Sequence, residues 1–201
     1  MKKSSILILI IICLVGCKKG SNETTITGEI KGLGTDTLYL YGMDELYDRI
    51  DTIYVENDKF SYTTSVDTIT SAYLLLKNRI EYPVFLDKGN KIKIKGDTIN
   101  LNFLTISGNI YNEEFTDFQK VLEDPADPSE KASEETVDKR ITVEKANTAE
   151  EMAEEFILQH HSSYVSLYLL DKYFVQKETP DFSKIKKLVE VMTGVLQDKP
   201  Y

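Results

Sequence analysis

Cys17 is the residue whose type and setting point most directly to chemistry. It is one of two cysteines in the 201-residue chain, and it closes the tetrapeptide Leu14-Val15-Gly16-Cys17. Small side chains before the cysteine would let a peptidase reach the bond that precedes Cys17. The thiol could carry a diacylglyceryl group through a thioether. We therefore expect Cys17 to be lipidated, with Leu14, Val15 and Gly16 as the signal peptidase recognition sequence.

The residues around this tetrapeptide support the same interpretation. Lys2 and Lys3 give the chain a positive start, and residues 6–15 form an unbroken apolar run of ten. A helix that spans a bilayer needs about 20 apolar residues, whereas the apolar region of a signal peptide has about 7–15. These features together match a bacterial lipobox, so we expect residues 1–16 to be a lipoprotein signal peptide. The alternative is an ordinary signal peptide with an incidental cysteine.

Lipidation would make the lipid bilayer the first partner of the chain, through acyl chains on Cys17, and we expect no other cofactor. Several acyl chains hold a protein stably, whereas a single chain binds only marginally. Lys18 is not the aspartate that retains enterobacterial lipoproteins in the inner membrane, and no acidic surface-export run follows the cysteine. We expect an anchor in the cell envelope, in the outer membrane and on its periplasmic face, with residues 17–23 as a flexible tether.

The elements that would position any further site follow two different periods. Residues 24–108 alternate polar and apolar side chains with a period of two, as strands do. The clearest case is the segment in which Ile92 and Ile94 should face inward and Lys91, Lys93 and Lys95 outward. About eight short strands, roughly ten residues apart, indicate an antiparallel β-sandwich or a barrel.

Turn signals predict how some of these strands are joined. Residues 56–58, Glu-Asn-Asp, should form a hairpin-type turn between strands at 49–55 and 59–63. Asn78-Arg79 should lie between two paired strands at 71–77 and 82–87.

Residues 109–201 change to a helical period. We expect a helix over 111–122, an acidic, proline-containing linker over 123–135, a charged helix after it, and a buried helix over 162–174. The last helix has the clearest pattern, with apolar residues on one face: Ile185, Leu188, Val189, Met192, Val195 and Leu196. The fold class is therefore α+β, an antiparallel β-sandwich or barrel-like N-terminal domain followed by a C-terminal helical segment.

The remaining residues give no enzyme signature. Both cysteines lie within the first 17 residues, so the folded part contains no thiol. His160 and His161 are adjacent and would point about 100° apart on a helix, which disfavours a shared metal ion. The chain lacks the HExxH, GxSxG and glycine-rich phosphate-loop patterns. We expect no catalytic residue, no metal site and no enzyme activity.

Charge and aromatic content bear on the partners. The chain has 24 Lys and Arg residues against 33 Asp and Glu residues, a net charge of −9. This balance argues against nucleic acid as a partner, because nucleic-acid binders normally present a basic face. The twelve tyrosines are predicted to pack in the core and across strands, where aromatic residues are favoured. A solute or glycan binder with a tyrosine-lined cleft is the alternative.

A series of segments, taken in order, resembles a known family. They are residues 26–30 (ITGEI), 37–40 (TLYL), 51–53 (DTI), 58–62 (DKFSY), 84–90 (VFLDKGN), 106–109 (ISGN) and 112–114 (NEE). The series is similar to the domain-of-unknown-function 4369 family, found at the N-terminus of many Bacteroidetes lipoproteins. Residues 156–166 are similar to a later segment of the same family, with His160-His161 where Asn-Pro is common.

This resemblance implies an activity that the chain cannot perform by itself. In such proteins the β domain and a helical hairpin usually precede a thioredoxin-like domain of the TlpA/ResA type, whose CxxC motif carries out thiol–disulfide exchange. No CxxC motif occurs between Cys17 and Tyr201, so that activity can be assigned to no residue here.

The leading hypothesis is therefore a membrane-anchored periplasmic lipoprotein that acts as a non-catalytic binding or dimerisation module. Its protein partner would be a second copy, in a homodimer, or another periplasmic protein. The alternative is the accessory N-terminal part of a thiol–disulfide oxidoreductase whose redox domain is missing or separate.

Overall fold

The structure is a computed structural model that describes residues 22–43, 45–123 and 137–192, with only the backbone described over 137–147. Its N-terminal part consists of two four-stranded sheets. We call them the β1 sheet and the β2 sheet. In strand order the β1 sheet contains β4 (Lys59–Ser65), β1 (Glu23–Lys31), β7 (Lys91–Asp97) and β8 (Thr105–Ser107). The β2 sheet contains β3 (Ile50–Val55), β2 (Asp36–Gly42), β5 (Thr70–Leu75) and β6 (Glu81–Leu86).

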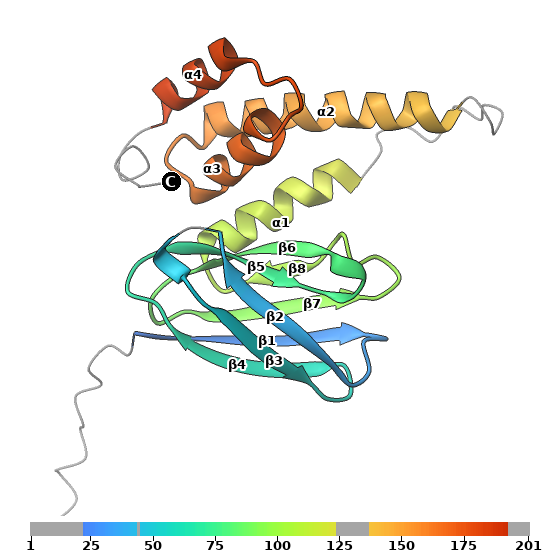
Figure 1. Ribbon diagram of the computed structural model, residues 1–201, viewed down its shortest axis with the longest axis vertical. Coiled ribbons are helices and arrows are strands. Elements are labelled where there is room, and N and C mark those ends of the chain that lie inside the picture. The colour runs from blue at the N-terminus through green and yellow to red at the C-terminus, as the bar shows by residue number, and fades with distance from the viewer. Residues whose placement is uncertain (1–21, 44, 124–136, 193–201) are drawn as a thin grey trace, which may run out of the picture.

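The two sheets pack face to face as a sandwich and do not close into a barrel (Figure 1). Inward-facing aliphatic residues fill the space between them, since branched side chains at alternate strand positions all reach the same face. Ile26 and Ile92 from the β1 sheet and Leu40 and Leu74 from the β2 sheet are completely buried. The predicted inward direction of the isoleucines and outward direction of the lysines in β7 is confirmed.

The sandwich departs from a purely antiparallel arrangement in one pair. β1 runs parallel to β7, with Ile26 opposite Ile92, whereas the other strand pairs are antiparallel. Parallel neighbours need a long crossover connection. Here the chain between β1 and β7 supplies the β2 sheet and β4, so local turn signals could not reveal this pairing.

The turn predicted at residues 56–58 is present, but its strands do not share a sheet. Asn57 and Asp58 have φ angles of 51° and 68°, and Glu56 and Lys59 exchange backbone hydrogen bonds of 2.9 and 3.1 Å. Positive φ at both central residues is typical of a tight hairpin turn. Beyond Lys59 the chain crosses over, so β3 belongs to the β2 sheet and β4 to the β1 sheet. The predicted pair around Asn78-Arg79 is confirmed as β5 and β6.

Helix α1 (Ile110–Glu123) lies against the edges of both sheets. Its buried Thr116 hydroxyl donates to the Ile106 carbonyl of β8 and accepts from the Ile106 amide, both at 3.0 Å. One turn earlier, Asn112 makes an equivalent pair of bonds to Phe85 of β6. Strand edges expose unpaired backbone groups that must find partners when buried. α1 therefore covers the side on which β6 and β8 end the two sheets.

The other helices form a layer above the sandwich (Figure 1). They are α2 (Val137–Gln159), α3 (Tyr164–Leu170), which continues as a π-helical segment (Asp171–Val175), and α4 (Phe182–Val191). Helix α3 packs on α1 and on the β2 sheet, α2 packs on α1 and α3, and α4 packs on α2. Phe115 of α1 joins these layers, with its ring centroid 5.8 Å from that of Tyr82 in β6 and 5.2 Å from that of Tyr168 in α3. These edge-to-face contacts make the helices and sandwich one continuous core.

The predicted end of the last helix is wrong, and most of the predicted acidic linker lies outside the described residues. The apolar pattern predicted a last helix that reaches Leu196, but α4 ends at Val191 because Met192 has an extended backbone (φ −68°, ψ 139°). Met192 is nevertheless buried, so it continues the apolar pattern without continuing the helix. The acidic linker predicted at 123–135 begins with Glu123, the last residue of α1, and its remainder lies outside the described residues.

Candidate functional site

The predicted lipidation site, Cys17, and its recognition residues Leu14, Val15 and Gly16 lie outside the described residues. The described part of the chain begins five residues after Cys17, at Asn22. There the Asn22 carbonyl accepts from the Val66 amide at 3.1 Å, and its side-chain amide donates to Asp67 at 2.8 Å. Five residues extend at most about 18 Å. A lipid on Cys17 would therefore hold the start of β1 within that distance of a membrane.

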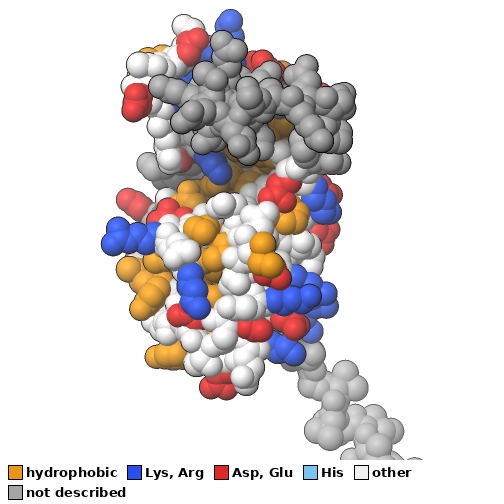
Figure 2. Space-filling view, turned by 90° about the vertical axis from the view of Figure 1, so that its right-hand side faces the viewer, with side chains coloured by type: hydrophobic (Ala, Val, Ile, Leu, Met, Phe, Trp, Pro, Cys, Tyr) orange, Lys and Arg blue, Asp and Glu red, His pale blue; other side chains and the backbone are white. Residues whose placement is uncertain are grey.

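The β1 sheet turns a polar, lysine-bearing face to solvent. Five exposed lysines define what we call the lysine face: Lys31 on β1, Lys59 on β4, and Lys91, Lys93 and Lys95 on β7. The three lysines of β7 are two residues apart, so they point to the same side of the sheet. Figure 2 shows a group of Lys and Arg side chains on the right flank of the β domain, with further Lys or Arg side chains on the left flank beside exposed hydrophobic ones.

Most of these lysines have no acidic partner among the described residues. Lys59 lies 3.9 Å from Glu29 in a solvent-exposed pair, which contributes little to stability. Lys31, Lys91, Lys93 and Lys95 make no ion pair with any residue that the structure describes. A chain with a net charge of −9 thus carries a local excess of positive charge on one sheet, five lysines against the two carboxylates of Glu29 and Asp97 that lie among them.

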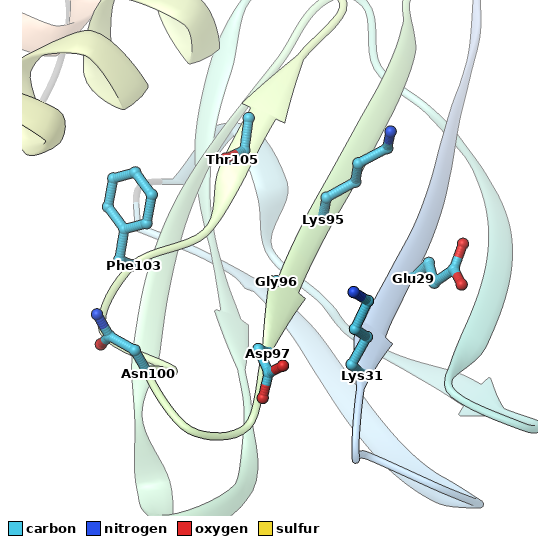
Figure 3. Close-up of a pocket in the computed structure, with 8 residues that line it drawn as sticks. All are labelled: Glu29, Lys31, Lys95, Gly96, Asp97, Asn100, Phe103 and Thr105. Atoms are coloured by element: carbon cyan, nitrogen blue, oxygen red, sulfur yellow. The ribbon is translucent and has the colours of Figure 1, made fainter.

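A shallow hollow of about 520 Å³ lies at one end of this face. Figure 3 shows Lys31 and Lys95 on neighbouring strands on one side of it and Asn100 and Phe103, from the loop between β7 and β8, on the other. The remaining lining residues are Glu29, Gly96, Asp97 and Thr105. Two ammonium groups, two carboxylates, an amide, a hydroxyl and one aromatic ring offer hydrogen bonds and ionic contacts to a polar ligand.

Part of this lining is held in place by bonds within the chain. Asp97 accepts a hydrogen bond from the Ile99 amide at 2.9 Å, and the Asn100 side chain donates to Glu123 of α1 at 2.6 Å. A second hollow of about 250 Å³ adjoins the first and shares Glu29 and Lys95 with it. The two hollows run across β1 and β7, so the lysine face is a furrowed surface.

A comparison with protein families finds a similarity over the β domain. Residues 24–115 match the family model of a domain of unknown function, DUF4369. The sandwich is therefore similar to this family over those residues. The match extends to Phe115 and so includes the first half of α1, which holds Asn112. A comparison with curated proteins finds no match.

The opposite face of the sandwich carries exposed apolar side chains along one edge. On the β2 sheet, Ile50 and Tyr54 of the edge strand β3 are each 73% exposed, and Tyr39 of β2 is 41% exposed. Toward β6 the same face is covered, since the Tyr73 ring packs 6.5 Å from that of Tyr168 in α3. The structure therefore separates a lysine-bearing face from a face with exposed aromatic residues.

Core packing, the use predicted for the tyrosines, is confirmed for four of them: Tyr47, Tyr82, Tyr164 and Tyr168 are buried. The Tyr82 hydroxyl donates to the Leu104 carbonyl at 2.8 Å, which joins β6 to the segment before β8. No tyrosine lines either hollow of the lysine face. The exposed Tyr39 and Tyr54 stand on the adjacent strands β2 and β3, and the glycan-binding alternative stays a prediction.

His160 lies between α2 and α3, next to Ser163, which caps α3. Its ring stacks on Phe156 at 4.2 Å, and its Nδ1 lies 3.5 Å from Glu114 Oε1 of α1. The adjacent His161 is exposed. The described residues contain no group of three or more His, Cys, Asp and Glu side chains suited to a metal ion. Nor do they include a helix long and apolar enough to cross a membrane.

A partly buried polar cluster that the sequence did not reveal joins the two sheets at one end of the sandwich. Asp51 of β3 accepts hydrogen bonds from Tyr47 and from Arg49, the latter at 3.1 Å, and Tyr47 also reaches Thr64 of β4 at 3.1 Å. Burial raises the pKa of Asp51, but the bonds from Tyr47, Tyr62 and Arg49 outweigh it and hold that pKa below its ordinary value. The hydrogen-bonding side chains of the cluster bond to one another, which indicates that the cluster is a structural link between the two sheets.

Proposed function

We propose that this protein is a lipid-anchored, non-catalytic binding module of the bacterial cell envelope. Cys17 would carry the lipid, and the lysine face of the sandwich would be the binding surface. The observation that carries this proposal is the course of β1. This strand is the first to follow the lipobox, it is fixed at Asn22, and it lies beside β7 in the centre of the lysine-bearing sheet.

Several features support the two parts of this proposal together. The lipobox and its apolar run provide a signal for acylation at Cys17. The short tether would keep the binding surface close to the bilayer, on the periplasmic face of the outer membrane in our proposal. The binding groups stand on paired strands, which hold side chains in position better than loops do.

The anchoring part is tested by replacing each cysteine separately in the producing cell. We expect the Cys17→Ala protein to incorporate no labelled palmitate. It should no longer be held in the membrane fraction by a lipid anchor. Cys13→Ala is the matched control, because Cys13 is a cysteine of the same leader outside the tetrapeptide. Its product should be labelled and membrane-bound like the wild type. Palmitate labelling that persists in Cys17→Ala contradicts the proposal.

A further inference from the structure

We infer that the lysine face docks on the anionic phospholipid headgroups of the same membrane that holds the Cys17 anchor, an inference that rests on the proposed function. The β1 sheet would then lie against the bilayer surface, with the β2 sheet and its exposed aromatic residues turned away. Lipid anchors are commonly reinforced by a cluster of basic residues that attracts acidic headgroups.

The spacing of the charges fits a surface of many phosphates better than a single ligand. Residues two apart on a strand are about 7 Å apart, so Lys91, Lys93 and Lys95 form a line along β7. Lys31 extends this line on β1, because the register places Lys31 opposite Asp97, two residues beyond Lys95. These four lysines are the ones without an ionic partner among the described residues, so their ammonium groups are available to phosphates.

The rest of the face favours contact at headgroup level without insertion. Its other outward positions carry mainly hydroxyl groups, among them Thr27 and Thr105 beside the lysines and Ser61 and Thr63 on β4. Two carboxylates, Glu29 and Asp97, lie opposite Lys95 and Lys31, so the lysines exceed the acidic groups on this face without excluding them. No large apolar side chain is exposed on these strands. Binding by such a face is electrostatic, so it should weaken as added salt screens the charges.

The place of the anchor supports this orientation. Thr25 of β1 lies opposite Lys91, so the tether enters the domain at the Lys91 end of the lysine row. Lys18 and Lys19 in the tether add two positive charges next to the lipid. A short tether gives the face a high effective concentration at the membrane. The acidic remainder of the chain is repelled by the same surface, which should turn the lysine face toward it.

Nothing in the described part of the fold covers this surface. α1 contacts the β6 and β8 edges through Asn112 and Thr116, and α3 contacts the β2 sheet through Tyr168. The helices thus occupy one edge and the opposite sheet, and the five lysines remain exposed.

The orientation can be measured by lysine footprinting of the acylated full-length protein in vesicles. The protein is reconstituted in phosphatidylcholine alone or in phosphatidylcholine with phosphatidylglycerol, and an amine-reactive reagent is followed by mass spectrometry. At low salt, labelling of Lys91, Lys93 and Lys95 should fall about fivefold or more in the anionic vesicles, and high salt should restore it. Lys186 and Lys187, exposed on α4, should label equally in both. Equal labelling of the β7 lysines in both vesicle types overturns the inference.

A single-tryptophan reporter gives a second reading that does not depend on lysine chemistry. The chain has no tryptophan, so Thr27→Trp places one probe on the exposed face beside the lysines. Its fluorescence should be quenched by headgroup-labelled lipids only in anionic vesicles. Combining the probe with Lys91→Glu, Lys93→Glu and Lys95→Glu should abolish quenching, whereas Lys186→Glu with Lys187→Glu should leave it unchanged. Quenching that survives the triple substitution overturns the lysine assignment.

Flotation of the vesicles separates the two proposals. A protein that floats with neutral vesicles through its lipid, but shows no lipid-dependent protection, refutes the docking and leaves the anchor intact. A protein that carries no lipid on Cys17 refutes the proposed function itself.

Discussion

The side-chain amide of Asn112 bonds both backbone groups of Phe85. Its nitrogen donates to the Phe85 carbonyl at 2.8 Å and its oxygen accepts from the Phe85 amide at 3.0 Å. A neighbouring strand would make the same two bonds, so Asn112 completes the edge of β6 in place of one. Asn112 is 1% exposed, and water cannot take over its role.

Removal of this amide should therefore be costly. We expect Asn112→Ala to lower the free energy of unfolding by about 2–3 kcal/mol, because two buried backbone groups lose their partner. Urea unfolding measures the loss. Asn102→Ala, at an exposed position, is the control and should change little. A loss for Asn112→Ala below about 0.5 kcal/mol would show that the bonds to Phe85 are not needed.

Gly28 and Phe60 should be coupled, since they face each other across β1 and β4. A Cβ added at Gly28 would lie 2.1 Å from the tip of the Phe60 ring, which is buried. We expect Gly28→Ala to lower stability by about 1–3 kcal/mol through overpacking. In a Phe60→Leu background, which opens space there, the same substitution should cost less than half as much. Equal costs in both backgrounds, in a double-mutant cycle, would contradict the predicted clash.

The carboxylate of Asp51 should make the sandwich sensitive to acid. Its folded-state pKa lies below the ordinary value of 3.8. Such a group adds stability above its unfolded-state pKa, and this stability disappears as the pH falls through the folded-state pKa. Asp51→Asn should therefore lower the unfolding free energy at pH 7 by about 1–3 kcal/mol, and the difference from wild type should shrink as the pH falls below the unfolded-state pKa of about 3.9.

Urea titrations at a series of pH values measure that difference. Asp48→Asn, at an exposed residue of the same segment, is the matched control. A gap between Asp51→Asn and wild type that stays constant down to acid pH would exclude this linkage.

The tyrosines should make the fold unstable at high pH. Burial raises the pKa of Tyr73 to about 12, and burial together with the bond to Asp51 raises that of Tyr47 to about 12. A tyrosine with a raised folded-state pKa adds stability that is complete below its unfolded-state pKa of about 10 and is lost as the pH rises toward 12. Tyrosinate absorbance and circular dichroism should therefore change together over this range.

A conservative variant checks the assignment to buried rings. Tyr73→Phe should shift the alkaline unfolding midpoint upward, whereas Tyr54→Phe, at a ring that is 73% exposed, should leave it in place. Ionisation of the buried tyrosines well before the dichroism changes would contradict the prediction.

Local sequence patterns predicted the individual strands and turns better than they predicted which strands pair with one another. Alternation at Ile92 and Ile94 identified β7, because burial on one face leaves a direct trace in sequence. The turn at Asn57-Asp58 was equally visible, yet a turn fixes only its own backbone and not the sheet that each strand joins. The buried roles of Asn112 and Thr116 were missed, because polar residues in a helical pattern are normally assigned to the solvent-exposed face. The sequence does not show that strand edges pack against these two side chains.

The candidate site was visible only in part. Alternation along the chain was sufficient to place Lys91, Lys93 and Lys95 on one side of a strand. Lys31 and Lys59 joined them only through the order β4-β1-β7, which depends on contacts between distant segments. The net negative charge of the chain did not indicate a basic surface, because a total charge does not show how lysines are distributed locally.

The parallel pairing of β1 and β7 has a consequence for the order in which the protein can form. β1 is the first strand of the domain, but its neighbours β4 and β7 come much later in the chain. Contacts between distant segments form slowly, because the entropy of loop closure must be overcome first. In the N-terminus-first export that the proposed function implies, β1 would lack its β7 partner until residues 91–97 had crossed the membrane. Under the proposed function, the enzymes that modify Cys17 would then meet an unfolded substrate, free of the domain that later crowds the bilayer beside it.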